Sequence, residues 1–241
     1  MSDTEILIKG ELHTSRGDLE EERAIIKDSV DHLIFEGPEE KDWHFKWSQI
    51  WFGWVLIIFE FLFARLLYVD KTIIEDLAEA QGVEPQSTRE SNASMLENTH
   101  TLVKMASAGL FCVLFAIALI VGWLGYVRQG SLWLFVSSLL PLYLVRSHES
   151  RRGSVGRDIQ IAEMIEEAAE DGGRVVAIVG AYHVDRIEEA LSDNLETEVR
   201  LPAYSALSLP HLKDLFYPTI TFLSVLYVVY SVMLAGVGFV L

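Results

Sequence analysis

Two histidines in this chain follow a glycine by three residues, each at the end of a short apolar run. The first is His13 in GELHT, residues 10–14, and the second is His183 in VVAIVGAYHV, residues 175–184. The carboxylate of Glu36 ends a third apolar run, and Glu11 precedes the first histidine by two residues. Two imidazoles and two carboxylates at one place would suit a divalent metal such as zinc, manganese or cobalt, or a metal-free acid–base pair acting on water.

The segments around the first histidine have the patterns of short strands and an amphipathic helix. Residues 4–9, TEILIK, predict a strand that ends at Gly10, and residues 32–37, HLIFEG, predict a second strand. Between them, residues 16–32 predict a helix with Asp18 as its N-cap and with apolar residues near one face. The chain is therefore expected to begin with a β-α-β unit.

Residues 147–200 return to the same soluble α/β character after a long apolar region. They predict a helix over 157–173, a strand over 174–180, a helix over 184–193 and a last strand over 196–202. The carboxyl ends of parallel strands collect ligands, because the turns that follow them face one crevice. We therefore expect His13, His183 and Glu36 in one crevice. Arg157 and Asp158 open the helix before the second histidine and could orient a substrate carbonyl or a ligand histidine.

Composition and charge narrow the class of protein. Hydrophobic residues make up 51% of the 241 residues and the mean hydropathy is +0.27, which favours a membrane protein over a soluble domain. The net charge of −16 falls almost entirely outside the apolar blocks, which argues against nucleic acid as a partner and favours a halophilic source. The N-terminus lacks the pattern of a signal peptide, so we expect the soluble part in the cytoplasm.

Four apolar segments could interact with a membrane: residues 47–69, 105–127, 131–145 and 219–241. The second and fourth are uncharged and as long as the roughly 20 residues that a bilayer requires, so both are expected to span it. The first contains Glu60 and Arg65, which are costly in hydrocarbon, and the third is short and contains Pro141. The sequence therefore predicts a multi-pass protein of the cell membrane, in contact with membrane lipid.

One crevice built from both histidines constrains the topology. Residues 1–46 and 147–200 would lie on the same side of the membrane, so the number of crossings between them must be even. We expect residues 47–69 to be the segment that does not span. It would lie along the interface, where its tryptophans fit, or pack on the domain. The competing topology makes residues 131–145 re-entrant and puts residues 70–101 outside. A weaker hypothesis is a transporter that uses Glu60 and Arg65 as functional charges.

The ordered set GELHT, LIFEG, RDIQIAEMI and VVAIVGAYHVDRIEEAL resembles the TraB/Tiki group, which is related to the erythromycin-esterase-like superfamily. The resemblance covers about residues 1–46 and 150–200. In that group the two G-x-x-H motifs, the glutamate that ends the second strand and the Arg-Asp pair form the presumed active site. The resemblance thus implies five site residues, to which Glu11 is a local addition. The five are His13, Glu36, Arg157, Asp158 and His183.

The resemblance also implies a function. Tiki members are metal-dependent peptidases, and TraB members include a membrane protein that suppresses peptide pheromone activity. For this chain it implies a metal-dependent hydrolase acting on peptides, with His13, Glu36 and His183 as ligands of manganese, cobalt or zinc. Whether the protein is an enzyme is left open. The alternative is a non-enzymatic membrane protein that binds a peptide, a metal or haem through the same histidines and acts in signalling or sequestration.

The expected architecture combines these parts. A small α/β domain with a mixed or parallel sheet comprises residues 1–46 and 147–210, which are the two halves of one site. Residues 47–146 form an apolar helical insertion with a membrane hairpin, and residues 211–241 contain a C-terminal transmembrane helix. The oligomeric state is not defined by the sequence, and a homo-oligomer remains compatible with it.

Overall fold

The computed structural model describes residues 4–38, 49–89, 96 and 99–240, and within these it gives no side-chain description for 37–38, 61–62, 88–89, 149–155 and 237–240. The chain divides into two compact units. The α/β unit comprises Met1–Lys41, Tyr68–Ser91 and Gly153–Asp214, and the apolar unit comprises Asp42–Leu67, Asn92–Arg152 and Leu215–Leu241. Each unit therefore draws on three separate stretches of the sequence.

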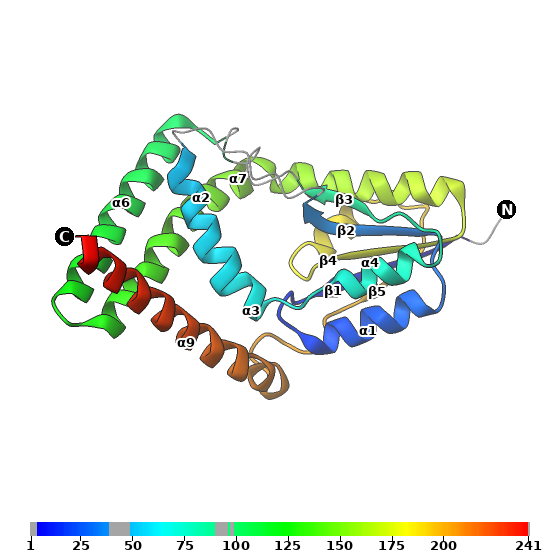
Figure 1. The fold of residues 1–241 in the computed structure, drawn as a ribbon. Helices are drawn as coiled ribbons and strands as arrows, with labels where there is room; N and C mark the ends of the chain where they lie inside the picture. The colour runs from blue at the N-terminus through cyan, green and yellow to red at the C-terminus, as the bar shows by residue number, and fades with distance from the viewer. Residues whose placement is uncertain (1–3, 39–48, 90–95, 97–98, 241) are drawn as a thin grey trace. The chain divides into compact units, whose positions relative to one another are not determined.

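A parallel sheet forms the centre of the α/β unit (Figure 1). Its strands are β1 (Glu5–Glu11), β2 (His32–Pro38), β3 (Gln86–Arg89), β4 (Arg174–Gly180) and β5 (Thr197–Arg200). Their order in the sheet is β3-β2-β4-β1-β5, and every pairing among them is parallel. The strand β4 therefore lies between β2 and β1, which places the second G-x-x-H turn between two strands of the N-terminal half.

Helices cover both faces of this sheet. They are α1 (Arg16–Lys27), α4 (Thr72–Glu79), α8 (Val184–Ala190) and the C-terminal part of α7 (Val127–Asp171). Alternate residues of β1 point to opposite faces, as expected for a strand. Ile8 packs in a cluster with residues of α7 and α8, whereas Leu7 packs with residues of α1 and α4. Burial of both faces explains the continuous apolar runs that the strands show in the sequence.

The coarse fold class is confirmed, since the protein combines an α/β parallel sheet with long apolar helices. Three details differ from the sequence-based expectations. Ser15, not Asp18, is the N-cap of α1, because its side chain accepts a hydrogen bond from the Asp18 amide. The strand β3 was not predicted, and with α4 it adds residues 68–91 to the α/β unit. The helix α7 runs continuously through Pro141 and the polar residues that follow it.

The apolar unit contains the remaining helices. They are α2 (Ile50–Ile57), the π-helix η2 (Ile58–Ala64), α3 (Arg65–Leu67), α6 (Thr101–Trp123), the first part of α7 and most of α9 (Leu209–Val240). Phe52 and Phe59 pack in one cluster with Phe111 of α6 and Val145 of α7. Four helical stretches are long and apolar enough to cross a membrane: Ile50–Leu67, Thr101–Trp123, Val127–His148 and Leu209–Gly236. This is consistent with a membrane protein.

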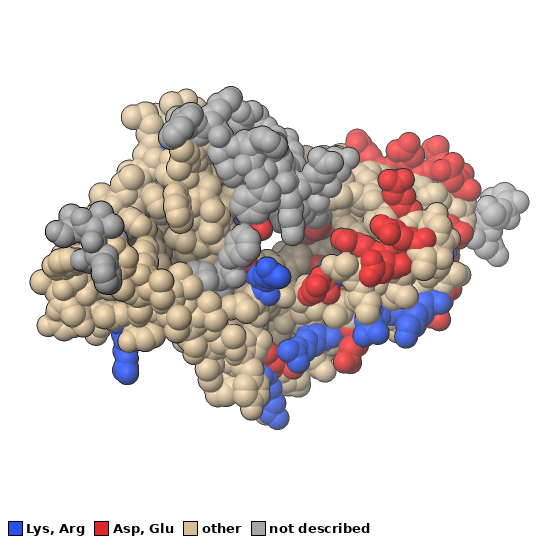
Figure 2. Space-filling view, in the orientation of Figure 1, with Lys and Arg blue, Asp and Glu red and all other residues tan. Residues whose placement is uncertain are grey.

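The distribution of charge follows the same division. Figure 2 shows Asp and Glu side chains gathered over the α/β unit, whereas the apolar unit exposes almost none on that face. The C-terminal part of α7 and helix α4 both carry acidic side chains on their exposed positions, such as Glu75 and Glu79. On the face in view, the acidic side chains therefore belong mainly to the α/β unit.

Candidate functional site

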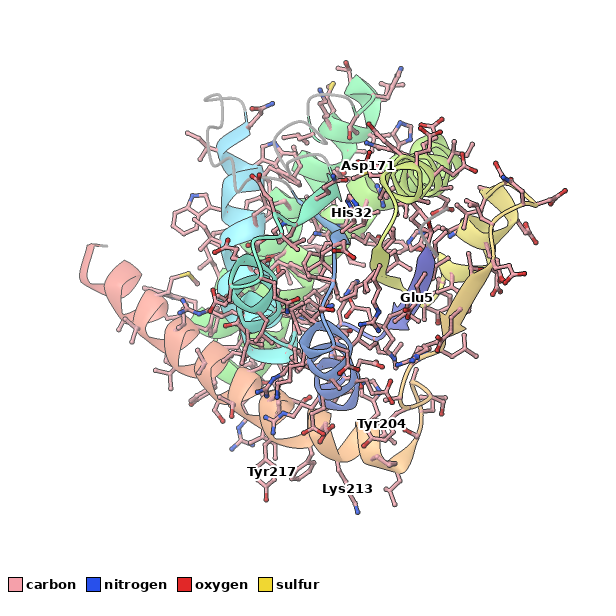
Figure 3. The ribbon with its side chains drawn as sticks, turned by 90° about the vertical axis from the view of Figure 1, so that its right-hand side faces the viewer. Glu5, His32, Asp171, Tyr204, Lys213 and Tyr217 are labelled. Atoms are coloured by element: carbon pink, nitrogen blue, oxygen red, sulfur yellow. The ribbon has the colours of Figure 1, made fainter. Side chains whose placement is uncertain are left out.

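The carboxyl ends of β1, β2 and β4 lie side by side, because the three strands are neighbours in a parallel sheet. Glu5 and His32, labelled in Figure 3, mark the amino ends of β1 and β2, so the histidine turns lie at the opposite edge. There the amide of Gly180 donates a hydrogen bond to Oε2 of Glu36 at 2.8 Å. The end of β2 is therefore tied to the turn that carries the second histidine.

Gly180 leaves open the space in which three predicted site residues meet. A Cβ atom at this glycine would lie 3.0 Å from Oε2 of Glu36, 3.4 Å from Cδ2 of His183 and 3.9 Å from Nε2 of His13. All three atoms lie within 4 Å of one point, so no two of them can be farther apart than twice that distance. The two histidines and Glu36 therefore share one site.

His183 is held between two carboxylates. Its Nδ1 atom lies 2.6 Å from Oδ1 of Asp158, and its Nε2 atom lies 3.3 Å from Oε1 of Glu36. Arg186 contacts the other oxygen of Asp158 at 3.1 Å, and Arg157 lies 3.9 Å from Oε1 of Glu36. Asp158 is almost fully buried, and its contacts with His183 and Arg186 offset the cost of burying its charge. The network fixes the orientation of the His183 ring.

His13 is held by one carboxylate and is more open to solvent. Its Nδ1 atom donates a hydrogen bond to Oε1 of Glu11 at 2.8 Å, and its ring lies 5.9 Å from the ring of Tyr68. The side chain of His13 is 42% exposed, against 18% for His183. The adjoining Tyr182 is 85% exposed. One histidine of the pair is therefore enclosed and the other faces solvent.

Behind His13 lies a buried group of charges of which only Glu11 was identified from the sequence. The ammonium of Lys71 contacts Glu11, and it lies 3.2 Å from Oε2 of Glu22. Although burial opposes it, the hydrogen bond from His13 and the charge of Lys71 lower the pKa of Glu11 to about 2. Burial, reinforced by the charge of Glu11, raises the pKa of Glu22 to about 8. At neutral pH Glu11 is therefore a carboxylate and Glu22 a carboxylic acid.

A signal for Glu22 was present in the sequence. Asp18, Glu22, Ile25 and Ile26 follow the spacing of one helix face, and all four are buried. A glutamate on the apolar face of a helix is unusual and indicates a buried partner. Lys71 had no such signal, because it precedes α4 and its position depends on how the chain returns to the sheet after the apolar segment.

A second buried pair supports the turn that carries His13. The side chain of Lys9 is fully buried and donates hydrogen bonds to Asp18 at 2.9 Å and to the carbonyl oxygen of Leu201 at 2.9 Å. The other carboxylate oxygen of Asp18 accepts a hydrogen bond from the amide of Leu12 at 2.9 Å. Asp18 thus satisfies the backbone next to His13 and neutralises a lysine that points into the core.

His211 also contacts this turn. Its Nδ1 atom donates to the carbonyl oxygen of Ala206 at 2.8 Å, and its Nε2 atom lies 2.9 Å from Oγ1 of Thr14. The residue is buried, and both ring nitrogens are used. The hydroxyl of Thr14 donates to Nε2, so a neutral ring satisfies both contacts. His211 therefore has a structural role beside the candidate site.

The imidazole nitrogens and carboxylate oxygens at the site are atom types that bind divalent metal ions. In each histidine the Nδ1 atom is held by a carboxylate, an arrangement that commonly orients metal-binding imidazoles. Within the described part of the chain, however, no three His, Cys, Asp or Glu side chains stand in an arrangement that could hold a metal ion. The ligand positions expected for His13, Glu36 and His183 therefore remain a prediction.

Comparison with known proteins gives no family. No family model, no curated protein and no solved structure matches this chain. The function is accordingly inferred from the geometry of the site.

Proposed function

We propose that the α/β unit is the hydrolytic domain of a membrane protein and acts on peptide bonds. The observation that carries the proposal is the convergence of His13 and His183 on Glu36, with the Nδ1 atom of each ring held by a carboxylate. When Nδ1–H donates to a carboxylate, the Nε2 atom of a neutral ring keeps its lone pair. Two such atoms near one carboxylate can hold an attacking water, and the carboxylate can accept its proton.

The contact between His183 and Glu36 supports a cation at this place. The Nε2 lone pair of a neutral His183 would face a carboxylate oxygen at 3.3 Å, which is repulsive unless a proton or a metal ion lies between them. In the metal-dependent form of the proposal, His13, Glu36 and His183 would hold manganese, cobalt or zinc. A bound ion would supply an acidic water and polarise the substrate carbonyl.

The other residues have roles that depend on their contacts. Glu36 is the proton acceptor for water, since it shares one space with the two rings. Glu11 and Asp158 orient His13 and His183 through Nδ1, and Arg157 provides positive charge beside Glu36 for the carbonyl oxygen of the substrate. These assignments use the same residues that the resemblance to the TraB/Tiki group implies.

The same resemblance motivates the choice of substrate and location. A peptide is the substrate class of the Tiki members, and the apolar helices are consistent with a membrane-embedded protein. We place the α/β unit in the cytoplasm, with its excess of acidic residues suited to high salt.

A cleavage assay tests the proposal directly. Full-length protein in detergent is incubated with a peptide library in high salt, with manganese, cobalt or zinc added separately, and the products are identified by mass spectrometry. We expect His13→Ala and His183→Ala to reduce cleavage about 100-fold or more, because each removes a group that acts on water. The matched control is His32→Ala, which removes a histidine from the amino end of β2. Elemental analysis of the same samples reports on bound metal.

The second candidate function is non-enzymatic binding of a peptide, a metal or haem. The exposure of His13 and of Tyr182 favours it, because a ligand can reach them without rearrangement. In that case the wild-type protein cleaves no peptide with any metal, yet binds one of these ligands, and His13→Ala weakens the binding. Equal cleavage by wild type and both site variants would exclude the hydrolase from this site.

A further inference from the structure

The α/β unit limits how the chain can cross a membrane. The strand β2 ends at Pro38, and residues 68–89 return to the same unit: β3 pairs with β2, and the ammonium of Lys71 contacts Glu11 of β1. The amide of Val69 also donates to the carbonyl oxygen of His13 at 2.9 Å. A hydrogen-bonded sheet lies on one side of a bilayer, since its backbone groups cannot be divided by hydrocarbon. The chain therefore leaves Pro38 and reaches Tyr68 on the same side.

Only one apolar segment lies between these two points. Residues 39–48, EEKDWHFKWS, contain five charged residues and are too short and too polar for a crossing of their own. The segment Ile50–Leu67 is 18 residues long and has a mean hydropathy of 2.0, so composition alone would make it a span. A single crossing would leave Tyr68 on the wrong side. We infer that Ile50–Leu67 does not cross the membrane and is embedded in the leaflet that faces the α/β unit.

The side chains of α2 fit a helix that is partly covered by protein and partly by lipid. Phe52, Val55 and Leu56 are buried within the apolar unit. The residues on the opposite stripe follow the spacing i, i+4, i+7 and are exposed: Ile50 by 41%, Trp54 by 56% and Ile57 by 41%. An exposed apolar stripe with a tryptophan suits the boundary between headgroups and acyl chains. The partner of this stripe is therefore the lipid of one leaflet.

The same reasoning assigns the other helices. Residues 68–89 and β4 share the sheet, so Thr101–Trp123 and Val127–His148 must cross together, as a hairpin, or not at all. Their hydropathy of 2.5 and 1.2 favours crossing. A hairpin of these two helices is incompatible with the topology in which residues 70–101 lie outside. The turn at 124–126 is then on the far side of the membrane, as is the end of α9. The inference depends on membrane insertion and does not depend on catalysis.

Cysteine accessibility tests the side of each segment. In a Cys112→Ala background, single cysteines replace Glu79 in α4, Asp193 after α8, and Gln129 at the start of α7, all of which are exposed. An impermeant thiol reagent is applied to intact cells and to inverted vesicles. We expect Glu79→Cys and Asp193→Cys to be labelled in the same preparation, and Gln129→Cys in the opposite one. Labelling of Glu79→Cys in the opposite preparation to Asp193→Cys, whichever of the two Gln129→Cys follows, would overturn the inference.

A depth measurement tests the embedding itself. Spin labels at Ile50→Cys, Trp54→Cys and Ile57→Cys are compared in vesicles of phosphatidylcholine and phosphatidylglycerol, using oxygen and a polar nickel chelate as relaxing agents. A helix in one leaflet gives similar shallow depths at all three positions. A crossing helix gives a steady increase of depth from Ile50 to Ile57 and a maximum at the bilayer centre, which would also overturn the inference. A label at Leu223→Cys in α9 is the control for a crossing helix.

Discussion

Glu36 is bound to the turn of the second histidine by both of its carboxylate oxygens. Oε2 accepts a hydrogen bond from the Gly180 amide at 2.8 Å, and Oε1 lies 3.3 Å from Nε2 of His183. A side chain on β2 is thus fixed relative to a turn that lies far away in the sequence. The position of this carboxylate depends on the pairing of β2 with β4 and on the absence of a side chain at Gly180.

Gly180→Ala tests the shared space. The added methyl group would lie 3.0 Å from Oε2 of Glu36, so we expect Glu36 to move and the proposed cleavage or ligand binding to fall by about 10- to 100-fold. The backbone of Gly180 does not have a positive φ, so the fold should tolerate alanine. The control is Gly156→Ala in α7, where a Cβ meets nothing within 4 Å. Equal loss of activity in both variants would refute the role of Gly180.

Asp158→Asn tests the orientation of His183. The carboxylate accepts a hydrogen bond from Nδ1 at 2.6 Å, and an amide at this place can present its NH₂ group to the ring and favour the wrong tautomer. We expect kcat to fall by about 10- to 100-fold with little change in KM, because the substrate itself is not contacted. Asp193→Asn, an exposed change in the same unit, is the control. A rise of KM at constant kcat would instead indicate that Asp158 binds substrate.

Glu22→Gln tests the buried acid in α1. The pKa of Glu22 in the folded protein, about 8, lies above the value of 4.5 for an exposed glutamate. The folded state therefore retains a proton that the unfolded state releases, and the contribution of this group to stability is full below pH 4.5 and lost as the pH rises to about 8. Glutamine resembles the protonated acid, so we expect the variant to lose less thermal stability than wild type between pH 5 and pH 8.

Melting temperatures in detergent across that range give the comparison, and Glu79→Gln on the exposed face of α4 is the control. Parallel pH profiles for wild type and Glu22→Gln would mean that Glu22 does not hold the proton.

Lys9→Met tests the buried ion pair beneath the His13 turn. Removal of the ammonium leaves the carboxylate of Asp18 buried without its cation, which costs about 3 to 5 kcal/mol in comparable cases. We expect a marked decrease in the melting temperature of the α/β unit. Arg200→Gln breaks the exposed pair with Glu198 and should cost at most about 1 kcal/mol. Similar effects of the two substitutions would show that burial adds nothing to the pair at Lys9.

The sequence was informative where local patterns determine the structure. Alternation and apolar runs identified β1, β2 and β4, and the position of His13 and His183 after such runs was sufficient to place both at one edge of a parallel sheet. The N-cap of α1 was misjudged by three residues, since both Ser15 and Asp18 are favourable capping residues and only the backbone distinguishes them.

The remaining features depend on contacts between distant segments. The strand β3, QSTR, is polar because it lies at the edge of the sheet, so no apolar run marks it. Lys71 reaches Glu11 only because the chain returns to the sheet after the apolar segment. The helix α7 continues through Pro141, and Leu142 and Val145 beside it are buried in the apolar unit.

The position of β4 has a consequence for the synthesis of the protein. Glu36 and Gly180 are 144 residues apart, so β1 and β2 leave the ribosome long before the strand that separates them in the sheet. Until then the edges of β1 and β2 that pair with β4 have no partner, and the contacts that complete the domain have high sequence separation. The hairpin of apolar helices is synthesised during this interval. The sheet edge that carries His13 and His183 is therefore completed only after these apolar helices have been synthesised.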